Sequence, residues 1–172
     1  RNQSCCRTCN SNGRSGMEMK NLLGEYVFTP DEIAKSLVES CDTKYSIVID
    51  PSTKMGFNLV VDKGLLKKNS DTVHQRTGLY AIYKDHHCLY TGKSGKSMGT
   101  RLGRFVKEVR NMSRSDEKHP AAKKYRSMWG EDFSNMTVSV YPLNEQSSMT
   151  LDDVELSLIR ILKPLLNVRG KK

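Results

Sequence analysis

The sequence predicts an α/β (α+β) domain with a central three-stranded, mainly antiparallel sheet flanked by helices. Three observations support this. Two β-prone runs at residues 77–83 and 88–91 have a hairpin pattern, a third run follows at 136–141, and apolar residues recur with helical spacing over 102–109 and 151–162. The chain has 172 residues, which is enough for one domain with additions.

The hairpin is predicted to bring two tyrosines together. We expect Asp85–His87 to form a three-residue loop, so that Lys84 pairs with Cys88. Successive side chains of a strand point to opposite faces. Four residues would then share one face of the hairpin, with Lys93 just past the strand end: Tyr80, Ile82, Tyr90 and Gly92. Tyrosine pairs of this kind are usually half-buried sheet residues, so the pair alone does not define a site.

A helix is predicted after the glycine-rich turn at residues 92–99. Its apolar face has the spacing i, i+3, i+4, i+7, and consists of Leu102, Phe105, Val106 and Val109. Arg101 and Arg104 lie beside this stripe, near the start of the helix, where they can reach back towards the hairpin. On an amphipathic helix such arginines are usually solvated charges, and their spacing alone assigns them no function.

The carboxylate of Glu155 is predicted to lie on the apolar face of the last helix. Thr150 and Asp153 have the spacing of a capping box, and Pro164 ends the helix. The apolar stripe between these ends consists of Leu151, Leu158 and Leu162, and Glu155 falls within it. A carboxylate at a hydrophobic interface is costly to desolvate unless a cation compensates it. That cation is either a basic side chain, which is the commoner case, or a divalent metal.

Five motifs in this order resemble the GIY-YIG nuclease superfamily, whose name spells its two hallmark tripeptides. They are Gly78-Leu79-Tyr80, Tyr90-Thr91-Gly92, Arg101 at the start of a helix, the Trp129-Gly130 turn before a strand, and Glu155 followed by Pro164 and Asn167. The similarity covers residues 77–168. Many members carry a histidine or tyrosine one turn after the arginine, where this chain has Phe105.

The resemblance implies a small GIY-YIG-type domain with the catalytic residues Tyr80, Tyr90, Lys93, Arg101, Glu155 and Asn167. Tyr80 would act as general base or position the attacking water, helped by Lys93 or by a metal-bound water. Since a phenol has a pKa of about 10, this role needs a nearby cation. Tyr90 would hydrogen-bond the phosphate or the metal shell, and Arg101 would bind the phosphate. Glu155 would bind one Mg²⁺ (or Mn²⁺) ion, and Asn167 would support the site through hydrogen bonds.

The resemblance therefore predicts a metal-dependent DNA endonuclease that hydrolyses phosphodiester bonds. Two alternatives stay open: a catalytically silent nucleic-acid-binding module on the same scaffold, and a nuclease directed at RNA. A silent module would not need a carboxylate on an apolar helix face, which favours the enzyme.

The charge of the chain favours a polyanionic partner, which we expect to be double-stranded DNA. The 28 Lys and Arg residues exceed the 19 Asp and Glu residues by nine, and the pI is about 9.4. The basic residues are dense in 101–124 and 160–172. We expect four residues to contact the substrate, with Arg104 the alternative to Arg101 at the attacked phosphate: Gly92, Lys96, Arg104 and Lys107.

The N-terminal part is predicted to be an elaboration on a core formed by residues 77–172. Residues 1–16 have the composition of a flexible tail. Within 17–76, a helix at 30–41 with Thr29 as its cap and strands at 45–50 and 56–62 are expected. This segment could contact DNA, form a homo-oligomer interface or simply pack on the core, and packing is the simplest interpretation.

Cysteine usage predicts a reducing, intracellular compartment, either cytoplasm or nucleus. Cys6 and Cys9 have zinc-ligand spacing, but a tetrahedral site needs four ligands and no second pair is spaced this way, so no zinc site is expected. Five cysteines also fit no disulfide framework. The chain has no apolar run of about 20 residues and no signal-peptide pattern, so we expect neither membrane insertion nor secretion.

Overall fold

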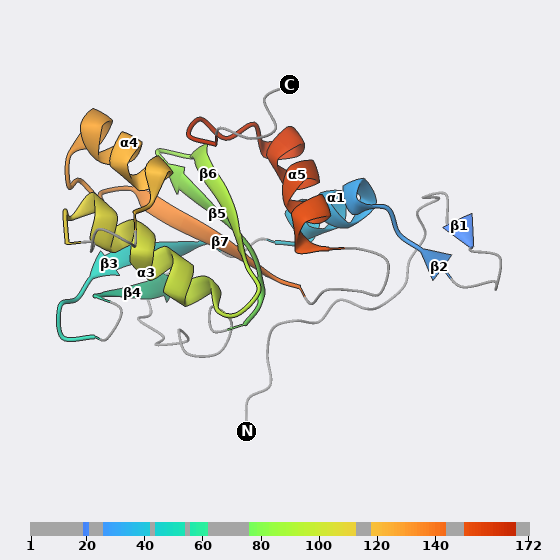
Figure 1. Cartoon of the computed structure of the whole chain (residues 1–172), viewed down its shortest axis with the longest axis horizontal. Coiled ribbons are helices and arrows are strands. Elements are labelled where there is room, and N and C mark those ends of the chain that lie inside the picture. The colour runs from blue at the N-terminus through green and yellow to red at the C-terminus, as the bar shows by residue number, and fades with distance from the viewer. Residues whose placement is uncertain are drawn as a thin grey trace.

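Helices cover both faces of an antiparallel sheet in this protein (Figure 1). The computed structural model describes residues 19–20, 26–41, 44–53, 56–61, 76–112, 118–143 and 150–167. Helices α3 (Met98–Val109) and α4 (Pro120–Trp129) pack on one face, and α1 (Pro30–Ser40) and α5 (Leu151–Leu162) pack on the other. The predicted mixed α/β class is confirmed.

The sheet has five strands in the order β4-β3-β7-β5-β6, with antiparallel pairing throughout. Its strands are β3 (Tyr45–Ile49), β4 (Phe57–Val61), β5 (Gly78–Lys84), β6 (His87–Ser94) and β7 (Met136–Pro142). The prediction of a three-stranded sheet was wrong because β3 pairs with β7, with Tyr45 opposite Val138, and thereby adds the β3–β4 hairpin. Strands β1 (Met19–Lys20) and β2 (Tyr26–Val27) form a separate antiparallel pair that was not predicted.

The turn between β5 and β6 is shorter than the predicted three-residue loop. Lys84 pairs with His87 instead of Cys88, and Asp85 and His86 form a two-residue turn with φ angles of 48° and 68°. Positive φ at both central residues is typical of a type I′ turn, whose twist matches that of the strands. Aspartate tolerates this conformation better than most residues do, which favours the tight turn.

A bulge in β6 restores the predicted register at the tyrosines. Leu89 has no partner on β5, and the pairing shifts by one residue at this point. The extra residue of the bulge offsets the residue missing from the turn. Ile82 therefore lies opposite Tyr90, and Tyr80 lies opposite Gly92, as predicted.

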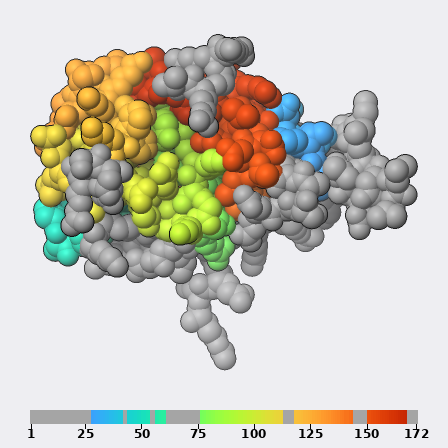
Figure 2. Space-filling model, in the orientation of Figure 1, coloured from blue at the N-terminus to red at the C-terminus, as the bar shows by residue number. Residues whose placement is uncertain are grey.

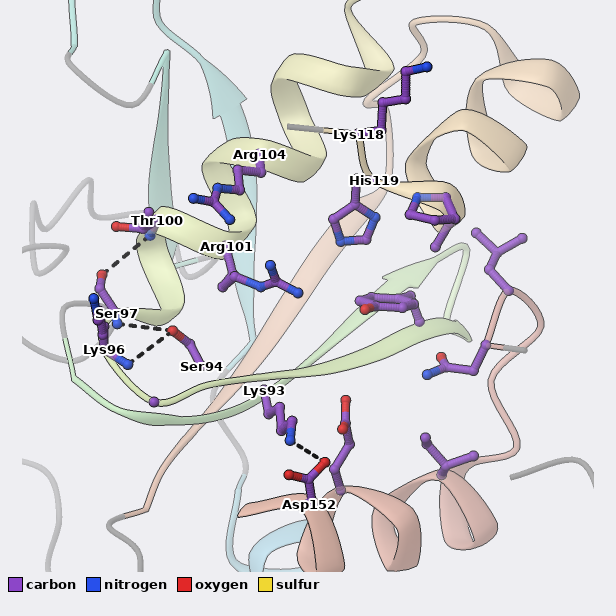
Figure 3. A pocket seen from close by; sticks show the side chains of 18 of the residues that line it. Lys93, Ser94, Lys96, Ser97, Thr100, Arg101, Arg104, Lys118, His119 and Asp152 are labelled. Atoms are coloured by element: carbon purple, nitrogen blue, oxygen red, sulfur yellow. Dashed lines mark hydrogen bonds and ion pairs between the residues drawn. The ribbon is translucent and has the colours of Figure 1, made fainter. Parts of the chain in front are cut away.

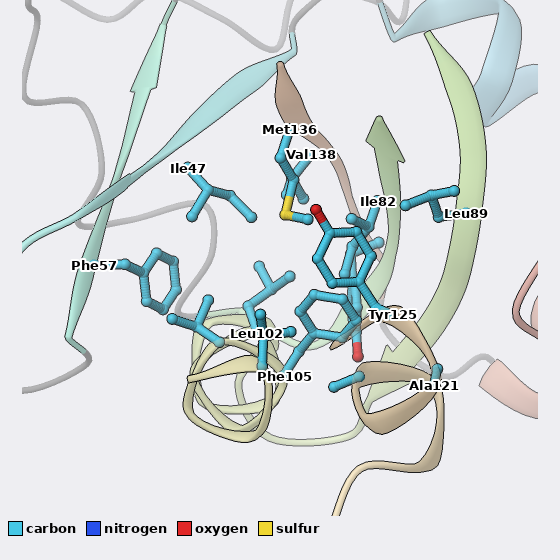
Figure 4. Close-up of a cluster of buried hydrophobic side chains, with 14 of the residues drawn as sticks. Ile47, Phe57, Ile82, Leu89, Leu102, Phe105, Ala121, Tyr125, Met136 and Val138 are labelled. Atoms are coloured by element: carbon cyan, nitrogen blue, oxygen red, sulfur yellow. The ribbon is translucent and has the colours of Figure 1, made fainter. Parts of the chain in front are cut away.

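The alternating side chains of β5 contribute to two separate cores. Tyr80 and Ile82 belong to the core beneath α3 and α4, which Figure 4 shows with residues of β3, β4 and β7 packed against both helices. The predicted apolar face of α3 is buried in this core. Leu79, Ala81 and Tyr83 belong to the opposite core, beneath α1 and α5. Because successive side chains of a strand point to opposite faces, Tyr80 and Tyr83 of β5 point away from each other, and both faces of β5 are buried.

Capping residues fix where α5 begins and ends. The Thr150 side chain accepts a hydrogen bond from the Asp153 amide, and the Asp153 carboxylate accepts one from the Thr150 amide at 3.1 Å, so the predicted capping box is confirmed. Lys163 ends the helix in the left-handed conformation just before Pro164. Thr29 and Glu32 form the same box at the start of α1. These caps hold Glu155 on the second turn of a well-defined helix.

Some of the predictions concern segments that the structure does not describe. The expected flexible tail of residues 1–16, with Cys6 and Cys9, lies outside the described residues. In the part of the chain that is described, no helix is both long and apolar enough to cross a bilayer.

Candidate active site

A cleft of about 990 Å³ opens beside the edge strand β6. One wall is formed by the start of α3 and the residues that lead into α4, and the other by α5 and residues 166–167 (Figure 3). The surfaces of α3 and α5 lie on the same face of the molecule in the space-filling view (Figure 2). Five basic side chains line the cleft, against two acidic ones: Lys93, Lys96, Arg101, Arg104 and Lys118, against Asp152 and Glu155. The cleft therefore has an excess of positive charge.

The two predicted tyrosines meet beneath this cleft. The ring centroids of Tyr80 and Tyr90 lie 6.1 Å apart with the planes tilted by 52°. Tyr90 lines the cleft, whereas Tyr80 is fully buried behind it. The Tyr80 hydroxyl has no hydrogen-bond partner among the described residues. Gly92 lies opposite Tyr80 and leaves room for both rings. It was expected to contact the substrate, but it is not among the residues that line the cleft.

Burial keeps both tyrosines protonated. Desolvation raises the pKa of Tyr80 well above 10.0, and the neighbouring Tyr90 raises it further. Desolvation also raises the pKa of Tyr90, followed by the charge of Glu155. Arg101 lowers both pKa values, but its effect is smaller than that of burial. Arg101 therefore does not lower the pKa of Tyr80 below its usual value, as a role for Tyr80 as general base near neutral pH would require.

Arg101 and Glu155 reach the two tyrosines from opposite walls. Arg101 is on the first turn of α3 and Glu155 on the second turn of α5, and both line the cleft. Each is close enough to shift the pKa of Tyr80 and of Tyr90. Two phenols, a guanidinium and a carboxylate from four segments thus converge on one cleft.

Lys93, on β6, forms an ion pair with Asp152 on the α5 wall of the cleft (Figure 3). Asp152 precedes Glu155 by three residues, so the two carboxylates lie on the same side of α5. The predicted partnership of Lys93 with Tyr80 is thus replaced by an ion pair with a residue that the sequence analysis did not select. Helical periodicity applied backwards from Glu155 would have identified Asp152.

Asn167 fastens the C-terminal segment to the edge of the sheet. Its side-chain oxygen accepts a hydrogen bond from the Thr91 amide, and its side-chain NH₂ donates one to the Thr91 carbonyl, both at 2.8 Å. The amides of Leu165 and Leu166 also bond to β6 carbonyls. Asn167 therefore lines the cleft as a structural clamp on β6, consistent with the supporting role expected for it.

The predicted substrate-binding residues separate into two groups. Lys96 and Arg104 line the cleft, but Lys107 does not. With about 100° of rotation per residue, Arg104 lies about 60° from Arg101 around the helix axis, whereas Lys107 lies about 120° away. Helical geometry thus turns Lys107 away from the cleft that the two arginines face.

His119 is a cleft residue that sequence reasoning missed. It is the N-cap of α4, and its Nδ1 atom accepts a hydrogen bond from the Ala122 amide at 3.3 Å. Its ring packs edge-on against Tyr90, with centroids 5.1 Å apart, and against Phe105 at 5.4 Å. Pro120 marks the start of the helix in the sequence, but histidine is not among the favoured N-cap residues, so the signal was weak.

Two carboxylates on the acidic wall of the cleft are candidate ligands for a Mg²⁺ ion. Among the described residues, no three His, Cys, Asp or Glu side chains are grouped as a metal site. Mg²⁺ is commonly bound through one or two carboxylates, with water and substrate phosphate completing its shell. Asp152 and Glu155 provide carboxylates at this wall, and the open cleft leaves room for the remaining ligands.

The chain matches no family model, no curated protein and no solved structure. A functional assignment therefore depends on the residues that the fold brings together at this cleft.

Proposed function

We propose that this protein is a metal-dependent endonuclease of the GIY-YIG type that hydrolyses phosphodiester bonds in double-stranded DNA. The observation that carries the proposal is the convergence of Tyr80, Tyr90, Arg101 and Glu155 on one basic cleft. These residues are far apart in sequence, and packing alone would not require them to meet. They are also the residues that the sequence resemblance selects.

Arg101 would bind the phosphate that is attacked. A guanidinium offers two parallel donors to two phosphate oxygens and keeps its charge at all physiological pH values. Negative charge grows on those oxygens as the water adds to phosphorus. A fixed cation at that point stabilises the transition state more than the ground state.

The tyrosines would act first as hydrogen-bond donors. Because burial raises both pKa values, each hydroxyl holds its proton near neutral pH. Tyr90, which lines the cleft, would donate to a phosphate oxygen or orient the attacking water. Tyr80 supports the Tyr90 ring from behind and keeps water out of the floor. Either hydroxyl could accept a proton as a phenolate only after a further positive charge in the cleft lowered its pKa.

Glu155, with Asp152 beside it, would hold the metal ion. A bound Mg²⁺ or Mn²⁺ ion would supply positive charge next to the phosphate and the leaving oxygen. Lys93 pairs with Asp152 in this structure. Glu155, which lines the cleft on the same side of α5, is the principal candidate ligand. The basic residues at the mouth of the cleft would bind neighbouring phosphates and give affinity that decreases with salt.

A plasmid-nicking assay tests this proposal. We expect purified full-length protein to convert supercoiled plasmid to open-circular or linear DNA with Mg²⁺ and to leave it intact with EDTA. Binding without cleavage in every divalent metal tried would contradict the proposal and favour a silent nucleic-acid-binding module. Preferential cleavage of RNA in a competition between matched duplexes would indicate an RNA-directed enzyme. Sequencing the cut ends would give the strand polarity.

A further inference from the structure

His119 has a buried polar atom that the fold itself does not use. The residue is 5 % exposed, and its Nε2 atom has no hydrogen-bond partner within the described part of the chain. A buried polar group without a partner destabilises the folded state. Such an atom at the wall of a cleft is expected to find its partner in a ligand.

The hydrogen bond at the other ring nitrogen determines what Nε2 can do. Nδ1 accepts from the Ala122 amide and so carries no proton. Burial, followed by the charge of Arg101, lowers the pKa of His119 to about 4, and the ring is neutral at neutral pH. A neutral imidazole has one N–H group. Nε2 therefore carries the proton and is a hydrogen-bond donor.

Neighbouring rings hold this donor in place. The His119 ring makes edge contacts at 75° with Tyr90 and at 86° with Phe105, and Phe105 stacks on Tyr90 at 21°. In Figure 3 the His119 ring projects into the cleft from the start of α4, facing the Arg101 side chain. The Phe105 ring offers no polar group here, so Nε2–H, which has no partner among the described residues, is available to a ligand beside the Tyr90 hydroxyl.

We propose that His119 is a substrate-binding residue whose Nε2–H donates to a non-bridging oxygen of the phosphate bound by Arg101. The inference rests on the proposed function, since it assigns a nucleic-acid phosphate to this position. The ring stays neutral throughout and acts as a donor, with no exchange of its proton with the substrate. Arg101 and His119 together present donors from both helices of one wall, α3 and the start of α4.

Two substitutions distinguish the role of His119 as a hydrogen-bond donor from its role as the N-cap of α4. Asparagine at an N-cap accepts from the helix amides as well as any residue does, so His119→Asn keeps the cap and removes the donor. Glutamine places an N–H₂ group near the position of Nε2, so His119→Gln keeps a donor and weakens the cap. We expect His119→Asn, which loses the ring contacts with Tyr90 and Phe105, to stay folded at the assay temperature but to cut about 10- to 100-fold more slowly. We expect His119→Gln to cut faster than His119→Asn despite its weaker cap. Wild-type cutting by His119→Asn would overturn the proposal, as would equal loss in both folded variants.

A binding measurement separates this inference from the proposed function. The imidazole nitrogens of ¹⁵N-histidine-labelled protein report the Nε2–H tautomer directly, and the probe is a short duplex oligonucleotide in Ca²⁺. We expect the His119 Nε2 resonance to shift when the duplex binds and to stay unshifted in an Arg101→Ala variant. If the His119 Nε2 resonance shifts but the protein never cuts DNA, the inference about His119 is upheld and the proposed endonuclease activity is refuted. Cutting without any shift of this resonance would refute the inference and uphold the endonuclease.

Discussion

Gly92 lies directly opposite Tyr80 in the β5–β6 ladder, and the tyrosine ring occupies the space above its backbone. A Cβ atom at Gly92 would lie 2.6 Å from Cζ and Oη of Tyr80 and 2.8 Å from Cε1 of Tyr90. No side chain fits there without moving one of the two rings. The glycine is therefore what allows both phenols to share the floor of the cleft.

Substituting Gly92 with alanine should damage both stability and activity. The new methyl group must displace a buried ring, and overpacking of this kind typically costs about 1–3 kcal/mol. We expect Gly92→Ala to lower the free energy of unfolding by that amount, measured by urea denaturation, and to abolish most plasmid cutting. Gly95→Ala is the matched control because a Cβ at Gly95 meets nothing within 4 Å. Equal stability of the two variants would contradict the observed packing.

The hydroxyl of Tyr80 should matter for activity and not for stability. It is buried without a hydrogen-bond partner among the described residues, so Tyr80→Phe removes an unsatisfied polar atom and fills the same space. We expect the free energy of unfolding to be unchanged or to rise by about 1 kcal/mol. Cutting should fall sharply, because phenylalanine has no hydroxyl that could accept a proton once a bound cation lowers its pKa. A destabilised Tyr80→Phe protein would show that the hydroxyl has a structural partner. Cutting at the wild-type rate would remove Tyr80 from the chemistry.

The charge of Glu155 should be essential for cutting and dispensable for DNA binding. Glu155→Gln keeps the size of the side chain and removes the carboxylate, so we expect no plasmid cutting in Mg²⁺ and retained duplex binding by fluorescence anisotropy. Asp152→Asn is the control on the same side of α5 and should keep measurable cutting, because Asp152 already pairs with Lys93. Metal-dependent cutting by Glu155→Gln would exclude Glu155 as the metal ligand.

Two basic residues on α3 should differ in their effect on salt-dependent binding. Arg104 lines the cleft and Lys107, one turn further along, does not. We expect Arg104→Ala to weaken duplex binding and to reduce the slope of log K against log[salt] by about one. Lys107→Ala should leave the slope unchanged. Equal slopes for the two variants would place the DNA along the helix rather than in the cleft.

Local patterns predicted the elements of this fold better than their spatial order. Alternation and apolar spacing predicted strands at 45–50 and 56–62, but pairing of β3 with β7 depends on contacts between distant segments. The hairpin shows a similar limit. Its predicted loop was one residue too long, and the bulge at Leu89 compensated for that error at Tyr80 and Gly92. The register was therefore correct at the tyrosines and wrong at the turn.

The same limit applies to the site. Arg101 and Glu155 were selected because they lie inside motifs that resemble those of a known family, and helical spacing alone assigned neither of them a function. His119 was missed because its importance arises from burial against Tyr90 and Phe105, which no local spacing encodes. The ion pair of Lys93 with Asp152 was missed because it joins β6 to α5, which are far apart in the sequence.

The titration of His119 should make the protein less stable in mild acid. Burial and the Arg101 charge hold its folded pKa at about 4, below the usual 6.5, and Glu108 offsets this only in part while Arg104 adds to it. Above pH 6.5 the ring is neutral in both folded and unfolded chains, and its contribution to stability is fully present. As the pH falls from 6.5 towards 4, the unfolded chain takes up a proton that the folded chain does not.

We expect this proton uptake to lower the free energy of unfolding by about 2 kcal/mol at about pH 5, relative to neutral pH. Urea denaturation at the two pH values measures the loss. His119→Asn retains the cap and lacks the titrating ring, so its loss over the same interval should be smaller by about that amount. The comparison cancels the carboxylates, which titrate identically in both proteins. An equal loss in the free energy of unfolding for the two proteins would contradict this prediction. It would show that the His119 ring accepts a proton as readily in the folded chain as in the unfolded one.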